Sequence, residues 1–435
     1  MLAVALLVVP IGCSGGGDDP GEASSQIPFY EVDPDSTTPT DEAIRTAQDA
    51  LRADPEDPSA QLDLAQAFLQ KGRETADPTL YTSAEVLLDM VAEVAPDDVR
   101  VLTAQGSLAL TRHLFADALD LSDQALEVAP GNETAYGVRV DALNELGRYD
   151  EAVEATQAMV DIRPSLASLA RVSYARELQG DLDGAILAMG QAITAAAGSG
   201  GENVAFAQVQ LGNLLLTRGD LVAAGQEYEE ALATFPELAA ARAGQARLLV
   251  AQERFAEAAD VLAELVEERP LIEYAVALGD ARTAAGDDEE AEDAYALVEG
   301  IARLLEANGF EVDLDLALFD AERDPGEGSV AQARRGLEQR PNIIGHDALA
   351  WALFTAGQPD EAADEVEAAL DTGSRDPQIR YHAAEVAAAT DDRAAAEEHL
   401  QVVLDTNPRF SAVHVDDVAA LADELGLAVP PVPAT

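Results

Sequence analysis

Lysine and cysteine are nearly absent from this chain. Its 435 residues include one lysine, Lys71, and one cysteine, Cys13. A single cysteine excludes an intrachain disulfide and a zinc site built from several thiolates. Acidic residues number 82 against 26 Lys and Arg, which gives a formal net charge of −56. Phosphate binding needs clustered positive charge, so we expect no nucleic-acid partner.

Aromatic residues are also few, at 5% of the chain, and no strand-period segment of any length stands out. The acidic residues are dispersed, which favours a solvated surface that keeps the protein soluble; the alternative is a functional acidic surface. The densest acidic cluster, Asp287 to Asp293, lacks the spacing of a calcium loop. We interpret it as the start of a helix, where the helix dipole favours negative charge.

Proline recurs at a fixed distance along the chain. Pro96, Pro130 and Pro164 are 34 residues apart, as are Pro236 and Pro270. A period of this size indicates one supersecondary unit that buries its apolar face against copies of itself.

The residues between the prolines indicate a helix pair. Gly212 and Ala224 are small enough to let two antiparallel helices approach closely. Gly219 suits the left-handed end of the first helix, and Pro236 stops the second. Where other copies have His113 or Asp391 in place of this glycine, a positive φ is tolerable, whereas Glu253 predicts a different turn.

These positions resemble the tetratricopeptide repeat. The resemblance implies an all-α superhelical solenoid of about ten helix pairs, with an N-terminal half-repeat and a C-terminal capping helix. The segments expected are a signal-like segment at 1–13, a disordered acidic tether at 14–40, the half-repeat at 41–57, pairs 1–4 at 58–197, a Gly-rich insertion at 198–204, pairs 5–7 at 205–308, a divergent pair 8 at 309–341, pairs 9–10 at 342–408, the capping helix at 409–427 and a Pro-rich tail at 428–435.

A second resemblance covers the stretch from Leu278 to about Asp417. Segments such as Arg340-Pro341-Asn342 and Asp347 to Leu353 are similar to the C-terminal part of a group of bacterial tetratricopeptide proteins. That group has no activity to transfer, so the resemblance leaves the function open.

The N-terminus resembles a bacterial lipoprotein signal. An apolar run from Leu2 to Val9 is followed by Gly12 and Cys13, and the run is too short to span a membrane. We expect lipid on the Cys13 thiol and an extracytoplasmic protein anchored to the bacterial cell membrane. The alternatives are an ordinary secretory signal with a soluble secreted or periplasmic protein, or an apolar N-terminus of no significance.

Sequence patterns of catalysis are missing. The five histidines, His113, His346, His382, His399 and His414, are scattered along the chain, and none forms the i, i+4 pair with a glutamate that marks a zinc helix. No phosphate-binding glycine loop is present, and no G-x-S-x-G elbow between a strand and a helix supports a nucleophilic serine. We therefore predict no enzyme, no catalytic residue, no cofactor and no metal site.

The remaining candidate is the surface of the solenoid. In the family, certain positions of each first helix face a concave groove that binds ligands. We expect Trp351 to be exposed there, because it is the only tryptophan and its position does not require packing; the alternative is that it packs on an adjoining helix. The favoured groove residues are Asp141, Asn144, Tyr174, Phe206, Asn213, Arg247, Asp280, Trp351, Phe354 and Tyr381, and the wider set adds Thr134, Glu145, Glu177, Val209, Glu273, Val276, Asp347 and Glu385.

The predicted function is a non-enzymatic scaffold that binds a protein or peptide of unknown identity in this groove. Two alternatives remain open at this point. One is an accessory protein that binds a cation or small cationic ligand at its acidic surface, and the other is an enzyme with a site in an irregular repeat.

Overall fold

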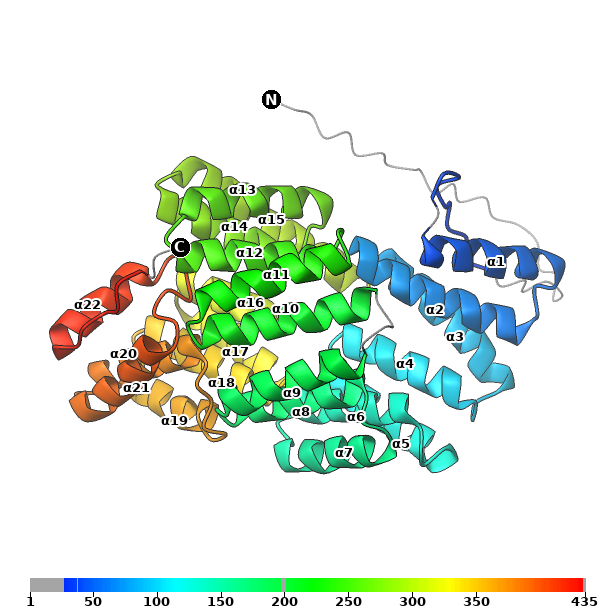
Figure 1. Ribbon diagram of the computed structural model, residues 1–435, viewed down its shortest axis with the longest axis horizontal. Coiled ribbons are helices and arrows are strands. Elements are labelled where there is room, and N and C mark those ends of the chain that lie inside the picture. Colours follow the sequence, from blue (N-terminus) through cyan, green and yellow to red (C-terminus); the bar gives the residue numbers. More distant parts are fainter. Residues whose placement is uncertain (1–26, 37, 197–200, 433–435) are drawn as a thin grey trace.

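The computed structural model describes residues 27–36, 38–196 and 201–432. The predicted signal-like segment with Cys13, much of the predicted tether and most of the Gly-rich insertion therefore lie outside the described residues. Within the described ranges the chain forms 22 helices and no strand (Figure 1). None of these helices is long and apolar enough to cross a membrane.

Ten consecutive antiparallel pairs account for the helices from α2 to α21, so the predicted all-α solenoid is confirmed. The half-repeat helix α1 packs on α2, and the capping helix α22 packs on α21. The helices are α1 (Pro39–Ala53), α2 (Pro58–Thr75), α3 (Thr79–Val94), α4 (Val99–Thr111), α5 (Phe115–Val128), α6 (Glu133–Glu145), α7 (Tyr149–Ile162), α8 (Leu166–Leu178), α9 (Leu182–Ala195), α10 (Glu202–Thr217), α11 (Leu221–Thr234), α12 (Ala239–Ala251), α13 (Phe255–Glu268), α14 (Ile272–Ala285), α15 (Asp288–Ala307), α16 (Asp313–Arg323), α17 (Glu327–Gln339), α18 (Ile343–Thr355), α19 (Pro359–Ala369), α20 (Pro377–Ala389), α21 (Arg393–Asp405) and α22 (Val415–Leu425).

Small residues set the distance between paired helices. Ala224 is fully buried, and the Tyr228 ring lies against both Gly212 and Gly244. A Cβ atom on Gly212 would lie 2.6 Å from that ring, so a larger residue would push the helices apart.

The turn inside nine of the ten described pairs uses a residue with positive φ, and the turn of pair 8 is the exception. Gly147 and Gly219 have φ of 68° and 84°, as the pattern predicts. His113 and Asp391 also adopt positive φ, and so does Glu253 at 58°. The expectation of a different turn at Glu253 is therefore wrong.

The superhelix closes on itself. Turns inside pairs 2 to 6 contact the connections that follow pairs 7 to 10, although these segments are 156–198 residues apart in the sequence. Figure 1 shows the yellow and orange helices α16 to α21 lying against the earlier part of the stack. The contacts join His113 to Glu311 (2.8 Å), Glu145 to Arg340 (2.9 Å), Tyr149 to Ile343 (2.8 Å) and Glu253 to Arg409 (2.6 Å).

Glycine permits the closest of these approaches. A Cβ on Gly147 would lie 2.1 Å from the carbonyl oxygen of Pro341, and one on Gly180 would lie 2.4 Å from that of Gly373. In a simple solenoid each repeat contacts only its neighbours. Here contacts across the superhelix join early and late repeats, which narrows the space available on the concave side.

Candidate functional site

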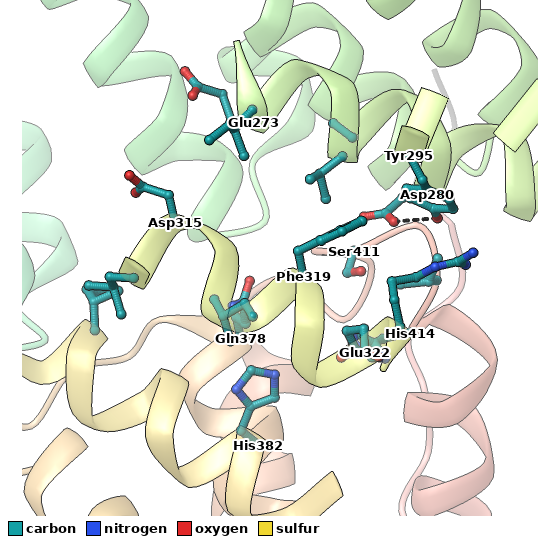
Figure 2. Close-up of a pocket in the computed structure, with 18 of the residues that line it drawn as sticks. Glu273, Asp280, Tyr295, Asp315, Phe319, Glu322, Gln378, His382, Ser411 and His414 are labelled. Carbon is teal, nitrogen blue, oxygen red and sulfur yellow. Dashed lines mark hydrogen bonds and ion pairs between the residues drawn. The ribbon is translucent and has the colours of Figure 1, made fainter. Parts of the chain in front are cut away.

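A cavity lies on the concave side of the last four pairs. Its volume is about 600 Å³. It is lined by the first helices α14, α16, α18 and α20, by the connection before α22, and by Tyr295 of α15 and Arg340 before α18 (Figure 2). On α14 the lining residues Val276, Asp280 and Thr283 are spaced so that they share one helix face. On α16 the same spacing brings Asp315, Phe319 and Glu322 to the cavity.

One end of the cavity holds a carboxylate without an ion pair among the described residues. Asp280 accepts a hydrogen bond from the Tyr295 hydroxyl at 2.9 Å, and Tyr295 in turn lies 3.2 Å from the Thr283 hydroxyl. The Arg323 guanidinium lies over the Tyr295 ring, 4.0 Å from its centroid. Burial raises the pKa of Asp280 to about 6; the hydrogen bond from Tyr295 opposes this shift, and the charge of Glu322 adds to it.

At another part of the cavity Glu322 and His414 form a hydrogen-bonded pair. Glu322 Oε1 lies 3.1 Å from His414 Nε2 and accepts a hydrogen bond from Trp351 Nε1. His414 Nδ1 lies 3.3 Å from Asp417 Oδ2. Burial alone would lower the pKa of His414, but Glu322 and Asp417 outweigh it and raise that pKa. Burial would likewise raise the pKa of Glu322, but His414 and the Trp351 hydrogen bond hold it below its ordinary value.

His382 lies beside this pair and is almost fully buried, with 1% of its surface exposed. Its Nδ1 lies 2.9 Å from the buried Asp347 carboxylate. Its ring stacks on Trp351 with centroids 4.0 Å apart and planes 13° apart. The ligating atoms of Glu322, His382 and His414 all lie within 4.8 Å of one another. Figure 2 shows these three side chains gathered from α16, α20 and the connection before α22.

The expectation that Trp351 is exposed in the groove is wrong. Only 4% of its surface is exposed, and it packs among Phe354, Tyr381, His382 and His414. Tyr381 is also buried, at 2% exposure, and Phe354 is partly buried against the same cluster. None of these three aromatic residues lines the cavity, although Trp351 contacts His382 and His414, which do.

Asp280 is the favoured groove residue that lines the cavity, and Glu273 and Val276 of the wider set line it as well. Arg247 donates to Asn213, which also accepts from Tyr228. Asp141 is paired with Arg171 at 2.5 Å.

Three further groove residues lie apart from the cavity. Asn144 is buried at 6% exposure, whereas Tyr174 and Phe206 are exposed at 39% and 49%. The structure therefore does not bring the ten favoured residues into one continuous surface.

Sequence reasoning missed Glu322, His382 and His414 as a group. Their separation of 60 and 32 residues gives no local spacing signal. Glu322 does hold the thirteenth position of pair 8, counted from Phe310, which is a concave position in the family. The divergent sequence of that pair concealed it.

Known proteins share the repeat. Models of the tetratricopeptide repeat match four segments that together cover more than half of the chain, at residues 40–87, 103–167, 215–281 and 348–409. The chain is also similar to the CTR9 homolog protein of Arabidopsis thaliana, with 29% identity over 123 residues. That match covers 28% of this chain and 11% of the plant protein.

Among solved structures, a thermophilic tetratricopeptide protein of Thermus thermophilus is 20% identical, with a TM-score of 0.38, and the match covers 42% of this chain and 98% of that one. The human IFIT1 dimer with m7Gppp-AAAA is 15% identical, with a TM-score of 0.48, and the match covers 77% of this chain and 76% of that one.

Proposed function

This chain belongs to the tetratricopeptide repeat family, and we propose that it is a non-enzymatic scaffold that binds a peptide or protein segment in the cavity of its last four pairs. The observation that carries the proposal is the cavity itself, about 600 Å³ on the concave side and lined by four successive first helices. A volume of this size accommodates one or two side chains of an extended segment.

The lining favours a ligand that combines apolar and positively charged groups. Val276, Leu318 and Phe319 supply apolar surface, while Asp280 forms no ion pair among the described residues. Arg340 also lines the cavity, but its guanidinium is already paired with Glu145 at 2.9 Å. An arginine or lysine side chain next to an apolar one fits this combination, and the net charge of −56 would speed its approach.

A fluorescence polarisation assay with basic and matched neutral peptides tests the proposal. We expect the basic peptides to bind and Asp280→Asn to weaken that binding by about 10-fold, the effect of one lost charge-assisted contact of about 1.4 kcal/mol. Glu229→Gln on α11 is the matched control, because this acid is exposed on a second helix away from the cavity. Equal affinity for basic and neutral peptides, or equal losses in the two variants, would contradict the proposal.

We also propose that the protein works at the extracytoplasmic face of a bacterial membrane, held there by lipid on Cys13. The support is the apolar run and the Gly12-Cys13 pair in the sequence. Membrane fractionation of the wild type and Cys13→Ser tests this placement. Release of the variant into the soluble fraction is the expected result, and retention of the variant on membranes would refute it.

A further inference from the structure

Two histidines and a glutamate meet at the cavity from three separate elements. Glu322 comes from α16, His382 from α20 and His414 from the connection before α22. Imidazole nitrogen and carboxylate oxygen are ligands of zinc and related divalent transition metals. The atoms that could bind an ion all lie within 4.8 Å of one another.

Each histidine is oriented by a carboxylate on its far side. Asp347 holds Nδ1 of His382 at 2.9 Å, and Asp417 lies 3.3 Å from Nδ1 of His414. In both rings this leaves Nε2 to face the cluster. Metal-binding histidines commonly use one ring nitrogen for the ion and the other for such a carboxylate, which fixes the ring orientation.

The second ring nitrogen of His382, Nε2, is available to an ion. The side chain is 2% exposed, and its Nε2 has no hydrogen-bond partner among the described residues. This atom is not among the side-chain atoms that are both fully buried and unpaired, so it keeps surface of its own, and because His382 lines the cavity an ion can reach it from there. Trp351 stacks on this ring and donates to Glu322, and so it restrains two of the three donors.

We propose that Glu322, His382 and His414 bind one divalent transition metal ion, with zinc as the expected ion. Three protein ligands leave at least one coordination position for water or a ligand in the cavity. A tetrahedral zinc site separates its donor atoms by about 3.4 Å, given bonds of about 2.1 Å. The Glu322–His414 separation of 3.1 Å is that of a hydrogen bond, and the three donors lie within 4.8 Å of one another. The ion would therefore replace the proton that His414 Nε2 shares with Glu322, and the more distant donors would move closer together.

Metal titration of the full-length protein, first stripped with a chelator, tests the site. We would titrate Co²⁺ and Zn²⁺ at physiological salt with excess Mg²⁺. The excess Mg²⁺ occupies the weak, nonspecific cation sites of the acidic surface, so the remaining Co²⁺ or Zn²⁺ binding reports the proposed site. Co²⁺ reports coordination by its visible absorption, and it should quench the fluorescence of Trp351, the single tryptophan, whose ring stacks on His382. Calorimetry with Zn²⁺ gives the stoichiometry, for which we expect one ion per chain.

Variants distinguish binding at this site from nonspecific cation binding by the acidic surface. His414→Gln, Glu322→Gln and His382→Gln should each weaken Co²⁺ and Zn²⁺ binding more than about 10-fold. Asp347→Asn should also weaken metal binding, because an asparagine lacks the negative charge that holds the His382 ring in place. His346→Gln is the control, since His346 pairs with Glu365 outside the cluster.

His382 is buried, so the test does not rest on its variant alone. Circular dichroism and thermal melting confirm the fold of each variant, and His414→Gln and Glu322→Gln are decisive because both side chains reach the cavity. Absence of saturable binding to the wild type in excess Mg²⁺ would overturn the proposal. So would unchanged affinity in these two folded variants, or an equal loss in His346→Gln.

Discussion

Gly147→Ala should open the superhelix at the contact between pair 3 and the end of pair 8. The glycine has φ of 68°, and a Cβ atom there would lie 2.1 Å from the Pro341 carbonyl oxygen. The added methyl group must displace that connection, which also carries the hydrogen bond from the Ile343 amide to the Tyr149 hydroxyl at 2.8 Å.

The expected loss of stability has three parts. An alanine in the left-handed region costs about 1 kcal/mol relative to glycine. Overpacking adds about 1–3 kcal/mol, and the loss of the Tyr149 hydrogen bond adds about 1 kcal/mol. Gly286→Ala is the matched control, because Gly286 has φ of 85° and a Cβ there would meet nothing within 4 Å. Gly286→Ala should therefore lose only the roughly 1 kcal/mol of an alanine in the left-handed region.

Urea denaturation measures the two losses of stability, and hydrogen exchange reads the contact itself. We expect Gly147→Ala to be about 2–4 kcal/mol less stable than Gly286→Ala, with a faster-exchanging Ile343 amide and a larger radius of gyration in X-ray scattering. If the two variants lose the same stability and the Ile343 amide exchanges as in the wild type, the closed superhelix does not persist in solution.

Three further outcomes follow from buried groups. Ala224→Trp should destabilise the protein by about 1–3 kcal/mol or more, measured by thermal melting, because Ala224 is fully buried between paired helices; an unchanged melting temperature would refute the packing. Trp351→Ala should lower the free energy of unfolding by about 3–5 kcal/mol, because the ring is 4% exposed. A much smaller loss would mean that the ring is exposed in solution. Burial raises the pKa of Asp280 from its ordinary 3.8 to about 6, so the folded state binds the proton more tightly and wild-type stability falls as pH rises between these values. In urea denaturation above pH 6, the free energy of unfolding of Asp280→Asn should therefore exceed that of the wild type by up to about 3 kcal/mol, and below about pH 4 the two should be equal. A difference that does not change with pH would refute this.

The helix pairs could be predicted from the sequence because their determinants are local. Pro236, Gly219 and Ala224 each act within one repeat, through a helix end or a close approach. The turn at Glu253 could not be predicted in this way because it meets a distant residue: its carboxylate pairs with Arg409 at 2.6 Å, 156 positions away. A repeat pattern holds no information about such a contact.

The candidate site was less predictable for the same reason. The expectation for Trp351 assumes an open groove with water at every concave position. In this chain His382 and His414 cover the ring, and both reach it from elements after pair 9. Small rotations between successive pairs accumulate along the stack, so the closure of the superhelix depends on many repeats together.

Closure of the superhelix and the cavity are physically connected through Arg340. This residue lines the cavity, and its guanidinium pairs with Glu145 of the earlier repeats and lies 3.5 Å from Asp315 of α16. A ligand that contacts Arg340 or Asp315 therefore interacts differently with the closed and opened arrangements. By thermodynamic linkage, a ligand that prefers the closed arrangement must stabilise that arrangement. A variant that opens the superhelix must therefore weaken the binding of this ligand by the same free energy. Gly147 is outside the cavity, so weaker peptide binding by folded Gly147→Ala would show that the contact between distant repeats is part of the binding mechanism.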